Sequence, residues 1–149
     1  MGRIGLDANV FLSVLLPEAT KTDRENVEGS ERILNALAQG DHIGITSSMV
    51  FAEIAWAFLR EDKATEEMEG AKYVLESMSN LEIIPVSNDI AWGAGKRRRK
   101  YHKRGQISYQ DAIYLTACVL EKVDVLYTSD PDLLDIEKPE TTIKQPKDF

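Results

Sequence analysis

Short apolar segments alternate with helical segments along the whole chain, and this order limits the possible folds more than any other feature. The order is strand, helices, strand, helices, strand, helices, strand, helix. Chains with this order form a parallel sheet that is covered by helices. We therefore predict a three-layer α/β fold, in which helices flank a central parallel sheet of four to five strands. At 149 residues, the chain is expected to form a single domain spanning residues 1–149.

The boundaries of the predicted elements come from apolar periodicity and from capping and turn residues. Strands are predicted at residues 3–6, 43–46, 81–86 and 123–127, with a possible edge strand at 141–144. Helices are predicted at residues 8–16, 31–39, 47–60, 65–78, 88–105 and 109–121, and a short helix begins at Pro131. Residues 18–29 are polar without periodicity and are predicted to form a mobile loop. The charged end of the 88–105 helix is predicted to project from the body of the protein.

Cysteine content and apolar runs exclude several classes of protein. The single cysteine, Cys118, lies in an apolar helical run and is predicted to be a core residue, which fits a reducing cytoplasm. No basic segment followed by an apolar one opens the chain, so we expect no secretory signal and a cytoplasmic location. Residues 43–59 carry Glu53 as their only charge, but this run is shorter than the ~20 residues that a membrane span needs. We predict instead a helix buried against the sheet, and no membrane association.

Four acidic residues are predicted to meet at one edge of the sheet. Asp7 and Asp130 directly follow strands, and Asp111 lies in the first turn of a helix that leads back to the fourth strand. Glu53 lies in the second turn of an apolar helix that leaves the same edge. Ligands of open α/β sheets bind at this carboxyl edge. Because clustered carboxylates repel one another unless a cation holds them, we predict a Mg²⁺ or Mn²⁺ site with these four acids.

Each acid also has a local explanation. Asp7 and Asp130 are suited to cap the helices that follow them, and Asp111 completes a capping box with Ser108. Glu53 would pair with a Lys or Arg at the rim of the fold. A bound cation explains all four positions at once, and we favour it for that reason.

Three further residues beside these acids are predicted to support the site. Asn9 and Thr128 offer neutral hydrogen-bonding groups that would orient metal-bound water, although local turn bonding explains them equally well. Asp132 follows Asp130 closely and is assigned the same supporting role.

Basic residues gather in one segment of a chain whose net charge is −7. Seven of the eighteen Lys and Arg residues fall within nine positions: Lys96, Arg97, Arg98, Arg99, Lys100, Lys103 and Arg104. This segment precedes the helix of Asp111, so we predict that it contacts the phosphates of RNA beside the acidic site. A solvated basic face, or a docking surface for an acidic protein, is the alternative.

The ordered set of motifs resembles the PIN domain family, in particular the VapC-type toxins of prokaryotic toxin–antitoxin pairs. The motifs are Asp7-Ala8-Asn9 after the first strand, Glu53 in an apolar helix, Asp111 in the segment DAIYLTA, Thr128-Ser129-Asp130 after a strand, and a Pro-x-x-Phe end at 146–149. Two departures are the long polar segment 18–29 and Pro131, where the family tends to place a charged residue.

This resemblance implies a metal-dependent endoribonuclease that hydrolyses RNA phosphodiester bonds through Asp7, Glu53, Asp111 and Asp130. It further implies a homodimer that is silenced by a cognate antitoxin protein. The alternative is a catalytically silent PIN-like module that binds RNA or another protein.

Overall fold

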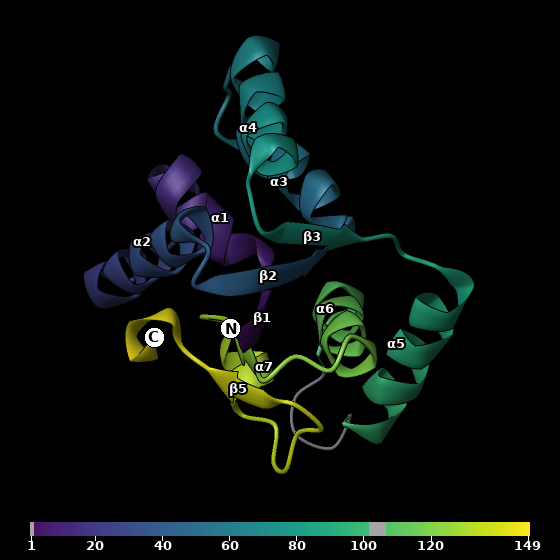
Figure 1. Cartoon of the computed structure of the whole chain (residues 1–149). Coiled ribbons are helices and arrows are strands. Elements are labelled where there is room, and N and C mark those ends of the chain that lie inside the picture. The colour runs from purple at the N-terminus through teal and green to yellow at the C-terminus, as the bar shows by residue number, and fades with distance from the viewer. Residues whose placement is uncertain (1, 102–106) are drawn as a thin grey trace.

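The computed structural model describes residues 2–101 and 107–149, and within them the chain forms a five-stranded parallel sheet (Figure 1). The strands are β1 (Gly2–Leu6), β2 (His42–Ser47), β3 (Leu81–Ile84), β4 (Val125–Tyr127) and β5 (Thr142–Lys144). They lie in the order β3-β2-β1-β4-β5, and every neighbouring pair is parallel. The predicted fold class is confirmed, including the edge strand near the C-terminus.

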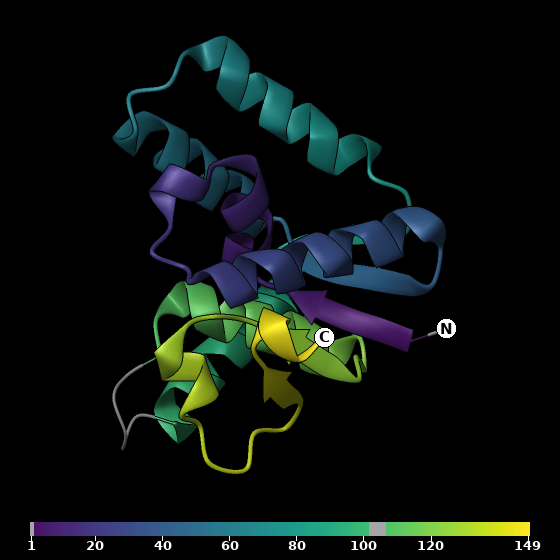
Figure 2. The ribbon, with the colours of Figure 1, turned by 90° about the vertical axis from the view of Figure 1, so that its left-hand side faces the viewer.

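Helices cover both faces of this sheet. They are α1 (Ala8–Leu15), α2 (Arg24–Gln39), α3 (Met49–Arg60), α4 (Thr65–Ser77), α5 (Asn88–Lys100), α6 (Tyr109–Leu120) and the short α7 (Pro131–Leu134), with 3-10 turns η1 (Pro17–Ala19) and η2 (Pro146–Asp148). Figure 2 shows α1 to α4 on one side of the sheet and α5 and α6 on the other. Among the described residues, no helix is both long and apolar enough to span a membrane.

Strand alternation divides the buried residues into two cores, one for each face. Ile4 and Leu6 of β1 pack toward α1 and α3, whereas Gly5 faces α6. A Cβ atom on Gly5 would lie 2.3 Å from Sγ of Cys118, so only glycine allows this close approach. Cys118 is buried, as predicted, and this burial raises the pKa of its thiol to about 12. It is therefore a packing residue.

The prediction of a loop at residues 18–29 is wrong at both ends, and only residues 20–23 lie outside a helix or strand. Residues 17–19 form η1, and α2 begins at Arg24 because the side chain of Asp23 accepts a 2.9 Å hydrogen bond from the backbone N of Asn26. The helix was predicted to begin at residue 31, yet Ser30 just before it already lies inside the helix and is buried. Gly40 ends α2 in the left-handed conformation at φ 82°, which favours glycine, and the helix ends at residue 39 as predicted.

Two expectations about helix burial are also wrong. α3 is not buried throughout, because Trp56 and Leu59 are 60 % and 68 % exposed on the side away from the core. The charged end of α5 does not project, since the helix packs along α6 and its Arg97 pairs with Glu140 at 2.9 Å. The described helix ends at Lys100, before the predicted boundary.

Candidate metal and nuclease site

Asp7 links the start of α1 to the loop after β4. Its Oδ1 accepts hydrogen bonds from the backbone N atoms of Asn9 (3.1 Å) and Val10 (3.3 Å), so Asp7 is the N-cap of α1. Its Oδ2 accepts a hydrogen bond from the hydroxyl of Thr128. The local explanation is therefore correct, but capping does not remove Asp7 from the predicted site.

Thr128 is fully buried and holds two acidic segments together. Besides donating to Asp7, its Oγ1 accepts a 3.0 Å hydrogen bond from the backbone N of Asp130. The turn bonding proposed for Thr128 is thus present, and it also positions the Asp7 carboxylate. The roles of Thr128 and Asn9 in orienting water stay predictions.

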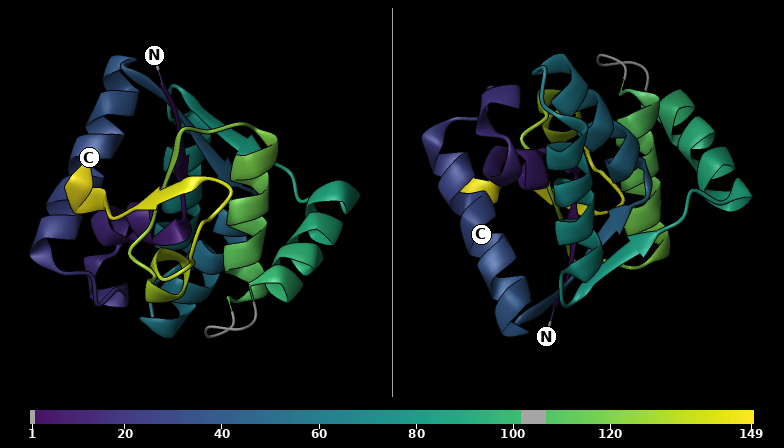
Figure 3. Two further views of the ribbon diagram at one scale, coloured as in Figure 1. Left: turned by 90° about the horizontal axis from the view of Figure 1, so that it is seen from below. Right: turned by 90° about the horizontal axis from the view of Figure 1, so that it is seen from above.

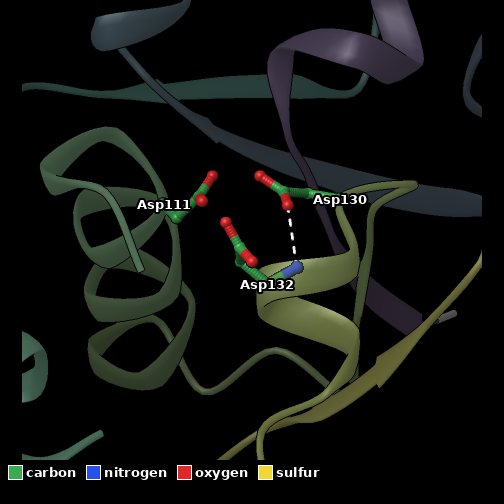
Figure 4. A group of neighbouring side chains, drawn as sticks. All are labelled: Asp111, Asp130 and Asp132. Carbon is green, nitrogen blue, oxygen red and sulfur yellow. Dashed lines mark hydrogen bonds between the residues drawn. The ribbon is translucent and has the colours of Figure 1, made fainter. Parts of the chain in front are cut away.

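Three aspartates meet where the start of α6 faces α7 (Figure 4). One carboxylate oxygen from each of Asp111, Asp130 and Asp132 lies within 4.8 Å of the others. The local explanation holds for Asp130, which caps α7, whereas for Asp111 the hydrogen bond observed is the one from its backbone to the capping residue Ser108. Oγ of Ser108 accepts a 3.0 Å hydrogen bond from the backbone N of Asp111, and Oδ1 of Asp130 accepts one of 2.9 Å from that of Asp132.

Glu53 enters the site from α3, on the other side. Its Oε2 accepts a 2.6 Å hydrogen bond from the hydroxyl of Tyr114, which is a buried residue of α6. The partner of Glu53 is therefore a tyrosine, and the Lys or Arg of the alternative explanation does not pair with it among the described residues.

All four predicted acids line one open pocket of ≈ 360 Å³. Asp7, Glu53, Asp111 and Asp130 form its acidic wall, and Asn9 also lines it. Asp132 lies beside Asp130 at the exposed end of the cluster. The structure thus brings together residues from the end of β1, from α3 and α6, and from the segment after β4, as the predicted carboxyl edge requires.

Burial raises the pKa of three of these carboxyl groups. Desolvation raises the pKa of Asp7 to about 7, although the hydrogen bond from Thr128 opposes the shift. Desolvation and the neighbouring Asp130 raise the pKa of Asp111. Desolvation also raises the pKa of Glu53, against the effect of the Tyr114 hydrogen bond. Without a cation, the charged form of each group is therefore unfavourable in this pocket.

The donor set fits a hard divalent cation. The groups that converge are carboxylates, which suit Mg²⁺ or Mn²⁺. One carboxylate oxygen from each of Asp111, Asp130 and Asp132 lies within 4.8 Å of the other two, so the three groups are near enough to approach a common ion. These three residues could share one ion after small side-chain rotations.

The basic segment is only partly available to a ligand. Arg97 pairs with Glu140, and Arg98 lies 4.0 Å from the centre of the Tyr109 ring while its Nε donates to the carbonyl of Ile107 at 2.9 Å. Lys96, Arg99 and Lys100 are exposed residues at the end of α5, and Nζ of Lys100 lies 3.6 Å from the carboxylate of Glu140. Lys103 and Arg104 lie outside the described residues.

A sequence model of the PIN domain matches residues 4–139. The chain belongs to the PIN domain family. The resemblance predicted from the order of the acidic motifs is confirmed. No protein with a curated description is significantly similar to this PIN domain in sequence.

Solved structures similar to this PIN domain include several toxin–antitoxin proteins. VapBC2 from Rickettsia felis, bound to a DNA fragment from its promoter, is 19% identical with a TM-score of 0.69, over 96% of this chain and 98% of that one. VapC20 from Mycobacterium tuberculosis, a toxin that cleaves the sarcin-ricin loop, is 16% identical with a TM-score of 0.65, over 91% and 97%. DNA-bound VapBC from Salmonella typhimurium is 17% identical with a TM-score of 0.62, over 98% and 99%. At these identities the likeness is one of fold.

Sequence reasoning missed Tyr114 as a contact of Glu53. The sequence did contain this information. Tyr114 follows Asp111 by three residues in a predicted helix, and residues at this spacing share one face, so Tyr114 would face the same site as Asp111. It was overlooked because a tyrosine in an apolar helical run is ordinarily a core residue.

Proposed function

We propose that this PIN domain is a metal-dependent endoribonuclease that hydrolyses phosphodiester bonds of RNA. One observation carries the proposal: Asp7, Glu53, Asp111 and Asp130 come from four separate parts of the chain and line one pocket. Carboxylates with raised pKa values that face one another are suited to hold a divalent cation.

The residues are assigned the following roles. Asp111, Asp130 and Asp132 hold Mg²⁺ or Mn²⁺, and Asp7 completes the site. When bound, the cation neutralises charge on the substrate phosphate and lowers the pKa of water. Thr128 fixes the carboxylate of Asp7, and Tyr114 fixes that of Glu53.

Glu53 is proposed to position the attacking water. Its Oε2 is engaged by Tyr114, which leaves Oε1 to accept a hydrogen bond from that water. The water oxygen forms the new bond to phosphorus and gives up a proton, the bond from phosphorus to one ribose oxygen breaks, and the leaving oxygen takes up a proton, so that no net proton is gained or lost in these two transfers.

We further propose that the protein is the toxin of a VapBC-type pair, acting in the cytoplasm as a homodimer with a cognate antitoxin. Related folds occur in VapBC2 of Rickettsia felis and in a toxin–antitoxin complex of Klebsiella pneumoniae. The exposed side chains of Trp56 and Leu59 line an apolar groove of ≈ 460 Å³ beside α4, which supports a protein partner.

The test combines metal binding with cleavage. Mn²⁺ binding is measured by calorimetry, and cleavage of total RNA is followed with Mg²⁺, Mn²⁺ or EDTA. Asp7→Asn and Asp130→Asn should each lower the cleavage rate by more than about 100-fold, beyond the loss typical of residues one step from the metal. Full activity in both variants would disprove the proposal. Metal binding without cleavage would indicate a silent module.

A further inference from the structure

A second polar pocket adjoins the acidic one. It has a volume of ≈ 410 Å³, and four residues line both pockets: Asn9, Ala19, Arg60 and Asp130. The two pockets therefore adjoin along these four residues, and we call the pair the trough. A volume of this size is sufficient for a small organic group such as a nucleotide.

The wall of the second pocket comes largely from the polar segment before and at the start of α2. Residues Thr20, Lys21, Thr22, Asp23 and Asn26 line it together with Gln145 from the C-terminal segment. This is the part of the chain that departs from the compact pattern of the family. This segment lies on the opposite side of α7 from the end of α5 (Figure 3, left).

Hydrogen bonds hold the polar groups of this wall in place. The buried side chain of Asn26 donates through Nδ2 to Oε1 of Gln145 at 3.0 Å and accepts through Oδ1 from the backbone N of Lys147 at 3.0 Å. Because Oε1 of Gln145 is engaged, the orientation of this amide is fixed. Gln145 lines the pocket, and its Nε2 makes no hydrogen bond among the described residues, so this amide nitrogen can donate to a ligand.

Two basic side chains, those of Arg60 and Lys21, line the trough. Arg60 lies at the junction of the pockets, where its Nη2 donates a 2.8 Å hydrogen bond to the carbonyl of Ala19. Lys21 lines the second pocket and is exposed. A guanidinium beside carboxylates that a metal would neutralise is suited to bind a phosphate.

We propose that the second pocket binds a nucleotide of single-stranded RNA adjacent to the scissile phosphate, with Arg60 and Lys21 contacting backbone phosphates and the Asn26–Gln145 wall contacting the sugar or base. The proposal rests on the proposed function and extends it. RNA would then cross the acidic site from this pocket toward the end of α5. Unpaired RNA is the substrate whose sugar and base edges are accessible to such a wall.

The test measures the binding of a fluorescein-labelled single-stranded RNA oligonucleotide in Mg²⁺ at several KCl concentrations. An Asp111→Asn background prevents cleavage during the measurement. Lys21→Gln should lower the log–log salt slope by about 0.7, and Lys21→Gln combined with Arg60→Gln by about 1.4. Lys21 is exposed, so its single variant remains informative if loss of the Arg60–Ala19 contact disturbs folding, which circular dichroism would reveal.

The matched control removes equal charge outside both pockets. Arg24→Gln combined with Lys72→Gln replaces one arginine and one lysine, each of which pairs with a glutamate on its own helix. This control should leave the salt slope within about 0.3 of the parent value, because neither side chain contacts the trough. In the active protein, Lys21→Gln should raise KM several-fold with kcat within about two-fold, which is the pattern of lost ground-state binding.

The outcomes separate the two proposals. If the parent protein binds RNA and the trough variants behave like the control, the nucleotide pocket is disproved while the proposed function stands. If the parent neither binds nor cleaves RNA, the proposed function fails and the pocket proposal fails with it. Stronger competition by oligoglutamate than by unlabelled RNA of equal length would assign the trough to an acidic protein instead.

Discussion

The hydroxyl of Tyr114 donates a 2.6 Å hydrogen bond to Oε2 of Glu53 and so joins α6 to α3 across the acidic pocket. The same helix carries Asp111 one turn earlier. Packing of α6 therefore positions two acids, Asp111 directly and Glu53 through the hydroxyl of Tyr114. Because Tyr114 is buried, this hydrogen bond is shielded from water and holds one carboxylate oxygen of Glu53 in a single place.

Replacing Tyr114 by Phe removes this hydrogen bond and keeps the ring. The bond lowers the pKa of Glu53 against desolvation, so its loss should raise that pKa further. The acid limb of the pH profile of kcat/KM should then move to higher pH. Loss of a hydrogen bond to a charged group should also lower the free energy of unfolding by about 1.5–3 kcal/mol, measured by urea denaturation.

Tyr109→Phe is the control for this variant, because Tyr109 is an exposed tyrosine of the same helix. It should change neither the pH profile nor the stability. If Tyr114→Phe also leaves the pH profile unchanged, Glu53 does not titrate in the reaction.

Asp7 should make the metal-free protein less stable as the pH rises. Its pKa is raised from 3.8 to about 7, so between these values the unfolded carboxyl group is ionised while the folded one holds its proton. The free energy of unfolding therefore falls with pH across this window and is level above it. The full effect corresponds to roughly 4 kcal/mol at 1.36 kcal/mol per pKa unit.

In EDTA, Asp7→Asn should thus be more stable than the parent at pH 8, and the two should converge near pH 4. The gain will be smaller than the full effect, because the amide replaces an acceptor of the Thr128 hydrogen bond. The exposed Asp41→Asn serves as the control. Equal stability of Asp7→Asn and the parent at pH 8 would mean that Asp7 is ionised at little cost.

The sequence predicted those parts of the site that follow from the order of strands and helices, and it missed those that depend on contacts between distant segments. Asp7, Asp111 and Asp130 each follow a strand or begin a helix, so topology alone placed them at one edge. The start of α2 was missed because Asn26 is polar, yet it is buried and hydrogen-bonded to Gln145 and to the backbone of Lys147 in the distant C-terminal segment. Such burial depends on a long-range contact that apolar periodicity cannot reveal.

The sequence also did not predict which acids lie nearest one another, namely Asp111, Asp130 and Asp132. Asp132 was assigned only a supporting role, because the direction of a side chain on a four-residue helix depends on how α7 packs. In the structure, its carboxylate meets those of Asp111 and Asp130. The exposure of Trp56 was missed for a related reason, since an apolar helix predicts burial without saying how many sides are covered.

Asp132 should therefore bind the metal together with Asp111 and Asp130. Asp132→Asn is expected to weaken Mn²⁺ binding by 10- to 100-fold, roughly the range for residues that tune a metal site. Asp135→Asn, an exposed aspartate just after the same helix, should leave the affinity unchanged. Isothermal titration calorimetry gives both values. Unchanged affinity in Asp132→Asn would restrict the site to the pocket-lining acids.

Metal binding should release protons below about pH 8. The raised pKa values of Asp7 and Asp111 mean that part of these groups is protonated near neutral pH, and a cation must displace those protons. The apparent Mn²⁺ affinity should then rise between about pH 5 and pH 8 and level off above. Calorimetry in two buffers of different ionisation enthalpy counts the protons released. Binding that is independent of pH and of buffer would show that the acids are already ionised.

Glu140 should limit the affinity of the α5 end for RNA. Its carboxylate accepts from Nη2 of Arg97 at 2.9 Å and from the Tyr101 hydroxyl at 3.2 Å, and it lies 3.6 Å from Nζ of Lys100. Although partial burial opposes the shift, Arg97 and Lys100 hold the pKa of Glu140 below its usual value. The carboxylate thus occupies the place where a phosphate would meet both cations. Glu140→Gln keeps a hydrogen-bonding side chain but removes the competing charge.

RNA affinity of Glu140→Gln should rise several-fold, and the log–log salt slope should steepen by up to about 1.4 as two cations become available to a single strand. Anisotropy measurements in the Asp111→Asn background give the slope. The matched control is Glu69→Gln on the exposed face of α4, which removes the same charge far from any described basic cluster. A slope that rises equally in both variants would reflect only the change in net charge. A slope that rises in Glu140→Gln alone would place RNA on Arg97 and Lys100, because long-range repulsion by one carboxylate is largely screened beyond about 10 Å at 0.1 M salt.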